Sequence, residues 1–309
     1  LLLLVSLPAT GESNIQESLE RVTGVRYRYT ELGALDIASA ETLAAQWLRQ
    51  LGRHEELDVT RITEAAVGHP GFIRDLCLHV ARRPKEHGSR LTLQQVIRTR
   101  IDELPEMPRR LLDVLAIAGP PLRQEVLLKT ASRRTTDALA GLADLRARSL
   151  VRFVGTGRPD RLVLDHDAVR RAALAGLSME RRRTLHEQIA KAMLALDAPD
   201  DHHISLHLHA AGALERAAEH AIKAASKSME RLAFSKAAEQ FDSAVQLLGG
   251  ELHAPPDLLR RAALAQVRAG RLATGARSLQ QAAERLAGHP KWETKRQAAS
   301  YLMLSGQRA

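Results

Sequence analysis

From Ser178 to its last residue, the chain contains no stretch with the pattern of a β-strand. Strand-like runs occur only earlier, at Leu1–Val5, Val25–Thr30, Leu150–Val154 and Arg161–Leu164. Elsewhere apolar residues recur every three or four positions, as on one face of an α-helix. Ala, Leu and Arg dominate the sequence, and aromatic residues are only 3% of it, which favours helices. The sequence therefore predicts a mainly α protein, and its 309 residues suffice for two or three domains.

The first 37 residues carry the remains of an α/β pattern. Leu1–Val5 is a continuous apolar run ended by Ser6 and Pro8, as in a buried strand of a parallel sheet. The run is too short to span a membrane, and it lacks the basic residues and cleavage site of a signal peptide. One or two strands cannot form a complete sheet, so we interpret residues 1–37 as the C-terminal edge of a larger α/β core. The alternative is a small helical domain with an unusual N-terminus.

Residues 38–104 predict a group of short helices. Gly68 and Pro70 end one of them, since glycine caps a helix C-terminus and proline cannot continue it. Thr92 caps the last helix of the group, and Pro105 stops it. The four predicted helices are Ala38–Leu51, Val59–Val67, Gly71–Arg82 and Leu93–Leu104.

Residues 105–177 predict three helices followed by a β-hairpin, which is the element order of a winged-helix domain. The helices are Pro108–Ala118, Leu122–Thr130 and Arg134–Arg146, and the hairpin strands are Leu150–Val154 and Arg161–Leu164. A DNA-reading helix would be the third one. Its polar face carries Asp137 and Asp144, whose charges would repel phosphate, so we do not expect this fragment to bind DNA.

Residues 178–309 predict one long helix, Glu180–Leu196, followed by paired helices rich in small residues. Ala237–Ala244 and Ala276–Ala283 share helix-pair character at an interval close to the roughly 34-residue period of tetratricopeptide repeats. Small residues let paired helices approach closely. The sequence therefore predicts an α-solenoid, a fold that offers an extended surface to protein partners.

Asp165-His166-Asp167 lies between the predicted hairpin and the next helix. A histidine at such a boundary can donate a hydrogen bond to a phosphate, and it loses this partner if the domain moves away. A structural role is equally open, because Asp167 or Asp165 can cap the helix that starts at Ala168. Arg170 and Arg171 follow on that helix, and we expect them on a solvated face.

Other candidate sites are weaker. His203 and His207 share a helical face within a cluster that includes His202 and His209, but no carboxylate set beyond Asp200 and Asp201 completes a metal site, so we expect helix packing. Cys77 is the single cysteine, which excludes internal disulfides and predicts a buried thiol in a reducing compartment. The net charge of +9 is spread along helices. The sequence has no phosphate-binding loop and no catalytic motif, so we expect no catalytic residue.

Taken in order, these motifs make the chain resemble the STAND class of signal-transduction ATPases. The similarity is to the bacterial branch in which an AAA-type ATPase module precedes tetratricopeptide-like repeats, as in large serine/threonine protein kinases. Gly68-His69-Pro70-Gly71-Phe72 looks like its Gly-x-Pro motif, and Thr92–Leu104 like its linker helix. Asp165-His166-Asp167 matches its nucleotide-sensing His-Asp, although the first position is not the usual Met. Leu1–Val5 looks like its sensor-1 strand, without the arginine that often follows.

The resemblance implies four domains: the edge of an ATPase core (1–37), a helical lid (38–104), a winged helix (105–177) and a helical linker with repeats (178–309). It implies a switch controlled by ATP and ADP, with Mg²⁺ bound outside this fragment. Gly68 and Pro70 would pack on the adenine, and His166 with Asp167 would sense the diphosphate. Protein partners of the repeats, a nucleotide-dependent oligomer and a cytoplasmic location also follow. The alternatives are a transcription regulator with its DNA-binding domain elsewhere, and a catalytically inactive helical scaffold.

Overall fold

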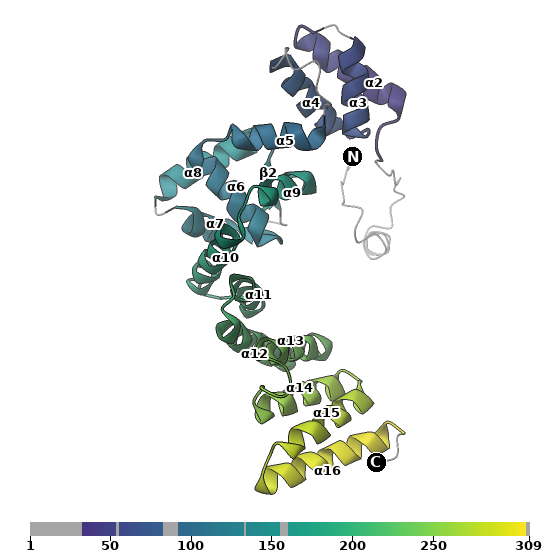
Figure 1. The fold of residues 1–309 in the computed structure, drawn as a ribbon, viewed down its shortest axis with the longest axis vertical. Helices are drawn as coiled ribbons and strands as arrows, with labels where there is room; N and C mark the ends of the chain where they lie inside the picture. Colours follow the sequence, from purple (N-terminus) through teal and green to yellow (C-terminus); the bar gives the residue numbers. More distant parts are fainter. Residues whose placement is uncertain (1–32, 54–55, 83–91, 133, 155–159, 307–309) are drawn as a thin grey trace, which may run out of the picture. The chain divides into compact units, whose positions relative to one another are not determined.

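The computed structural model describes residues 33–53, 56–82, 92–132, 134–154 and 160–306 (Figure 1). These residues form 15 α-helices and one three-stranded antiparallel sheet, so the predicted mainly α class is confirmed. The chain divides into two compact units, residues 1–93 and 94–309. The predicted strands Leu1–Val5 and Val25–Thr30 lie outside the described residues.

The N-terminal unit contains three helices that pack against one another. They are α2 (Ile37–Gln50), α3 (Glu56–Ala66) and α4 (Pro70–Arg82). The Asp36 side chain caps α2 by accepting a hydrogen bond of 2.7 Å from the backbone N–H of Ser39. Ala40, Ala44 and Leu48 are buried at four-residue spacing on α2, as the apolar stripe predicts. All three helices agree with the predicted ones to within about three residues at each end.

The C-terminal unit begins with a domain built around one buried helix. Its elements are α5 (Leu93–Asp102), α6 (Glu106–Ala118), β1 (Leu122–Arg123), α7 (Gln124–Ala131), α8 (Thr135–Ala147), β2 (Val151–Val154), β3 (Arg161–Leu164) and α9 (Asp167–Ala175). Every residue of α6 from Leu111 to Ala118 is buried, because α7, α8 and α9 all pack against this helix.

The sheet has the strand order β1-β3-β2, with both neighbouring pairs antiparallel. Phe153 and Leu122 both pair with Leu162, which lies on the central strand β3. The prediction of a helix from Leu122 was wrong by two residues, since Leu122 and Arg123 pair with β3 and the helix starts at Gln124. Tertiary pairing with a distant strand outweighs local helical periodicity here.

Seven helices follow, each packed on the next along the chain. They are α10 (Met179–Leu194), α11 (Asp201–Ala211), α12 (Leu214–Glu230), α13 (Phe234–Leu247), α14 (Pro256–Arg268), α15 (Leu272–Glu284) and α16 (Gly288–Leu304). Alanine dominates their buried faces, and Phe241 is the largest fully buried side chain. The helix α10 also packs on α6 and α7. Small residues thus permit the close helix pairing that the sequence predicts.

One turn recurs three times in this stack. Gly212, Leu232 and Gly270 all have positive φ and lie two residues before α12, α13 and α15. In each turn, the N–H of the next residue donates a hydrogen bond of 2.9 Å to the carbonyl five residues before that residue. Counted from the first residues of α13 (Phe234) and α15 (Leu272), Phe241 corresponds to Leu279. The predicted match of Ala237 with Ala276 is therefore out of register by one residue.

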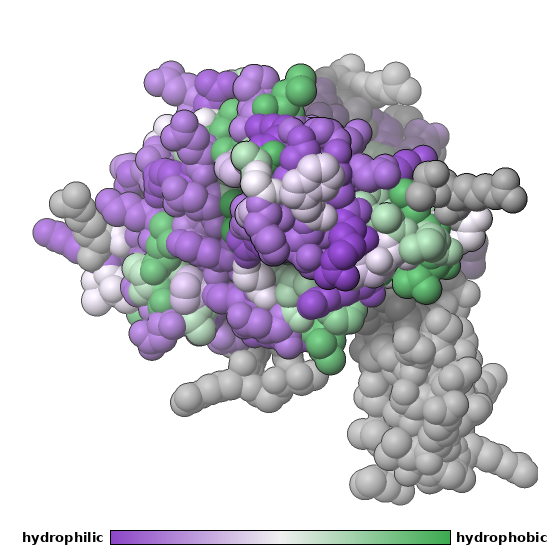
Figure 2. Space-filling model, turned by 90° about the horizontal axis from the view of Figure 1, so that it is seen from below, coloured by the Kyte–Doolittle hydropathy of each residue, from purple (hydrophilic) through white to green (hydrophobic). Residues whose placement is uncertain are grey.

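In the described part of the chain, none of the helices is both long and apolar enough to span a membrane. On the face drawn in Figure 2, hydrophobic side chains form small separate patches among hydrophilic ones. Scattered apolar residues of this kind are ordinary on protein surfaces.

Candidate functional site

The Gly68–Pro70 turn lies between α3 and α4. Val67 and Gly68 have positive φ, and the N–H of His69 donates to Ala66 O at 3.0 Å, which ends α3 as predicted. The Gly68 carbonyl accepts a hydrogen bond of 2.8 Å from Leu35 N. A Cβ atom on Gly68 would lie 2.4 Å from Leu35 O. Both the backbone conformation and this contact therefore require glycine at position 68.

A pocket of about 510 Å³ opens beside Pro70. Its lining residues are Leu35, Ala38, Ser39, Thr42, Leu43, Gln46 and Pro70. Two of its polar groups already have intramolecular partners: Ser39 Oγ donates to Asp36 and Thr42 Oγ1 to Ala38 O. The pocket is thus mainly apolar, with Gln46 as a further polar residue in its lining.

His166 is the N-cap residue of α9, and Asp165 alone separates it from the end of β3. Its ring is about one-third exposed, and its Nε2 lies 3.8 Å from Asp165 Oδ2. Asp165 also faces Arg152, whose Nε is 3.5 Å from Oδ1. The helix-capping role predicted as the alternative for Asp167 was wrong. It is the first residue of α9 and pairs with Arg171, while position 166 holds the N-cap.

The two arginines of α9 have different surroundings. Arg171 is exposed, as expected. Arg170 instead crosses to α6, where its Nε donates to Ala116 O at 3.1 Å. Its guanidinium also lies against Gly119, where an added Cβ would be 3.0 Å from Nη2. The expectation of a solvated face was therefore wrong for Arg170, which fastens α9 to the buried helix of the domain.

Two arginines beside the helix considered for DNA reading have partners within the domain. The Arg146 guanidinium lies 4.9 Å from the Phe153 ring centroid, and Arg148 Nε is 2.8 Å from Asp144 Oδ1. The expectation that this fragment does not bind DNA stays a prediction.

The two histidines of α11 that share a helical face, His203 and His207, have different partners. His203 Nδ1 bonds Asp200 Oδ2 at 2.8 Å, whereas His207 Nδ1 meets His186 Nδ1, on α10, at 2.8 Å. Within the described ranges, no group of three or more potential metal ligands comes together. Sequence reasoning missed His186, although it neighbours Leu185, whose spacing to Ile189 marks a buried helix face.

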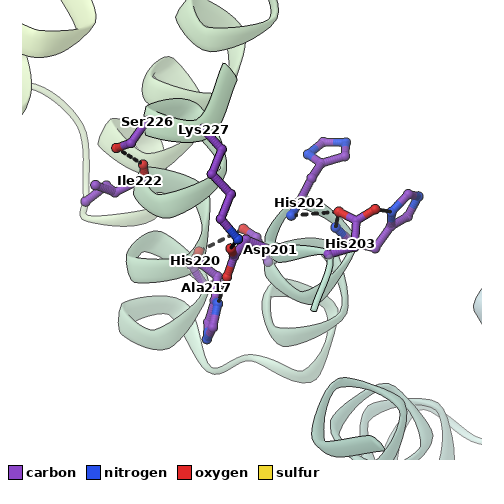
Figure 3. Close-up of polar contacts among 10 residues, drawn as sticks. Asp201, His202, His203, Ala217, His220, Ile222, Ser226 and Lys227 are labelled. Atoms are coloured by element: carbon purple, nitrogen blue, oxygen red, sulfur yellow. Dashed lines mark hydrogen bonds and ion pairs between the residues drawn. The ribbon is translucent and has the colours of Figure 1, made fainter. Parts of the chain in front are cut away.

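A second polar cluster joins α11 to α12. The buried Asp201 carboxylate lies 2.7 Å from His220 Nδ1 and 2.6 Å from Lys227 Nζ. Figure 3 shows these two side chains converging on Asp201, while the rings of His202 and His203 extend away from it. Burial alone would raise the pKa of Asp201, but the hydrogen bonds from Lys227 and His220 outweigh it and lower the pKa. The arrangement holds two helices together.

No protein-family model matches this chain, and no curated protein has significant sequence similarity to it. The predicted site residues occupy both units: Gly68 and Pro70 belong to the first, and His166 and Asp167 to the second.

Proposed function

We propose that the chain is the regulatory part of a nucleotide-controlled signalling switch of the STAND type. The observation that supports this most directly is the Gly68–Pro70 turn, which is held against Leu35 and contributes Pro70 to the lining of a pocket. Helical stops are common, but a stop whose glycine is fixed by a backbone contact and whose proline faces a pocket suits a ligand-binding role.

An adenine ring fits the chemistry of this pocket. Leu35, Ala38, Leu43 and Pro70 provide apolar surface for a flat heterocycle. Gln46 carries both a donor and an acceptor, so its amide can pair with the polar edge of the base. The described residues hold no phosphate cradle, and in this proposal the phosphates and Mg²⁺ bind to a loop outside these 309 residues.

His166 would report the state of the nucleotide. Its partly exposed imidazole lies at the N-terminus of the nine-residue helix α9, where the helix dipole favours negative charge. A hydrogen bond from His166 to the diphosphate of ADP would favour one state of the switch, and its loss would favour the other. Such a switch needs ADP and ATP to bind the two states with different affinity.

The helical stack would connect this switch to proteins. The helices α10 to α16 pack consecutively, which is the construction of repeat proteins that bind partners on an extended surface. We propose that the parent is a cytoplasmic multidomain protein, such as a serine/threonine protein kinase, whose output this stack controls.

Calorimetric titration of ADP and ATP into the full-length natural protein tests this proposal. His166→Ala should weaken ADP binding at least about fivefold, the scale of one charge-assisted hydrogen bond of ~1 kcal/mol, with a smaller effect on ATP. Gln46→Ala should weaken both nucleotides equally, because both carry adenine. His289→Ala, an exposed histidine on α16, is the control and should change neither.

If the protein binds neither nucleotide, the switch is excluded, and the chain is better described as a helical scaffold. If His166→Ala affects ADP and ATP equally, His166 is not the sensor.

A further inference from the structure

The ring nitrogens of His186 and His207 face each other across the contact between α10 and α11. The two Nδ1 atoms are 2.8 Å apart, and the ring centroids 5.1 Å apart. His207 is only 5% exposed. At this distance one Nδ1 must donate and the other must accept, so the pair accommodates a single hydrogen between the rings. Two imidazolium ions would place two N–H groups and two positive charges face to face.

The pair lies at the contact between the sheet-containing domain and the rest of the helical stack. The helix α10 packs on α6 and α7 of the sheet-containing domain, whereas α11 packs on α12. The apolar part of the α10–α11 contact includes Ala190 and Met193, which pack in one cluster with Ile204 and Leu208. The histidine pair therefore lies in the contact through which α10 meets the rest of the helical stack.

Charges on the neighbouring helices do not stabilise a positive His207. Among described groups, those acting on it are His186, on α10, and His203, and both disfavour its protonation. Several carboxylates on these helices and on the helices packed against them are paired with other groups. On α11 and the residue before it, Asp201 bonds His220 and Lys227 of α12, and Asp200 bonds His203. On α6, Asp113 faces Arg109, and on α7, Glu125 bonds Lys129.

We propose that the His186–His207 pair makes the α10–α11 contact sensitive to pH, closed when both imidazoles are neutral and loosened when they are protonated. The contact would thereby couple the sheet-containing domain to the helical stack at neutral pH and release it under mild acid. This inference does not depend on the proposed nucleotide switch.

The direction of the pH effect follows from the difference in proton affinity between the closed and open states of the contact. Burial, and then the charges of His186 and His203, lower the pKa of His207 to about 4, against about 6.5 in an open or unfolded chain. Burial also lowers the pKa of His186. The open state therefore binds protons more readily, and the contact loses stability as the pH falls from about 6.5 towards 4. For His207 alone, the equilibrium constant for opening should rise about sevenfold between pH 6 and pH 5.

Hydrogen–deuterium exchange on the full chain tests this proposal. His207→Gln keeps an acceptor for His186 but cannot be protonated, and His209→Gln changes an exposed histidine on the same helix. Comparing each variant with the wild type at the same pH cancels the intrinsic pH dependence of exchange. We expect α10 and α11 of the wild type to lose protection on going from pH 7.5 to 5.5, relative to His207→Gln, and His209→Gln to behave like the wild type.

Equal pH dependence in the wild type and His207→Gln would overturn the proposal. If His207→Gln does not fold, NMR titration of the imidazole nitrogens in the wild type decides the matter. A His207 that stays neutral well below pH 6 supports the inference, and one that titrates near 6.5 refutes it.

Discussion

At the scale of single residues, the left-handed backbone of Gly68 and the carbonyl oxygen of Leu35 leave no room for a side chain. Gly52 has the same sign of φ but open space around it, so nothing lies within 4 Å of a Cβ added there. Comparing alanine substitutions at the two positions therefore separates the free-energy cost of a side chain at positive φ from the additional cost of a steric clash.

We predict that Gly68→Ala destabilises the N-terminal unit by about 2–4 kcal/mol, whereas Gly52→Ala costs about 1 kcal/mol. Urea denaturation followed by Trp47 fluorescence measures this, in a Trp292→Phe background that leaves Trp47 as the single tryptophan of the chain. Equal losses in the two variants would show that the Leu35 contact is relaxed without cost.

Sequence reasoning reached Gly68 because glycine and proline mark a helix end directly. It could not reach the pairing of His207 with His186, since these residues lie 21 positions apart on different helices. It also placed Arg170 in solvent, because nothing in a local pattern indicates that a long side chain reaches Ala116 O on another helix. Local conformation was predictable at these positions, and partners distant in the sequence were not.

At the scale of elements, the turn before α13 differs from its two equivalents. Gly212 and Gly270 adopt positive φ at little cost, but Leu232 has φ of 60° and is 72% exposed. A side chain in this conformation costs about 1–2 kcal/mol, and exposure means that it recovers little by packing. Neither glycine nor proline marks the break between α12 and α13 in the sequence.

Leu232→Gly should therefore stabilise the stack by about 0.5–1 kcal/mol, after allowing for the greater flexibility of glycine in the unfolded chain. Leu252→Gly is the matched control, since Leu252 is 84% exposed without positive φ, and it should not stabilise. Thermal or urea unfolding followed by Trp292 fluorescence distinguishes the two. A loss of stability in Leu232→Gly would show that the leucine side chain makes favourable contacts.

At the scale of the whole molecule, sequence periodicity predicted the helices well and one strand poorly. The hairpin strands were predicted from their apolar runs, and α2 from the spacing of Ala40, Ala44 and Leu48. The two-residue strand β1 exists only through its pairing with β3, which no local pattern encodes. The predicted domain limits and the nucleotide site stay predictions.

The consecutive packing of α10 to α16 makes a prediction about truncation. A chain ending at Ala287 lacks α16, which packs mainly on α15. Protection of α15 amides from hydrogen exchange should fall at least about tenfold, because Leu279 loses its contact with Ala298, while α11 and α12 should change less than about twofold. Trp292→Ala, which changes an exposed residue and keeps α16, is the control. Loss of protection as far as α11 would contradict nearest-neighbour stability.

The same packing has a mechanical consequence. Because each helix of the stack holds chiefly to the ones before and after it, a pulling force along the chain is carried by these interfaces in series. The weakest interface yields first and the remainder stay intact, so the stack would lengthen in discrete steps under tension and shorten again when released. A protein built in this way can absorb strain between two tethered domains without unfolding as a whole.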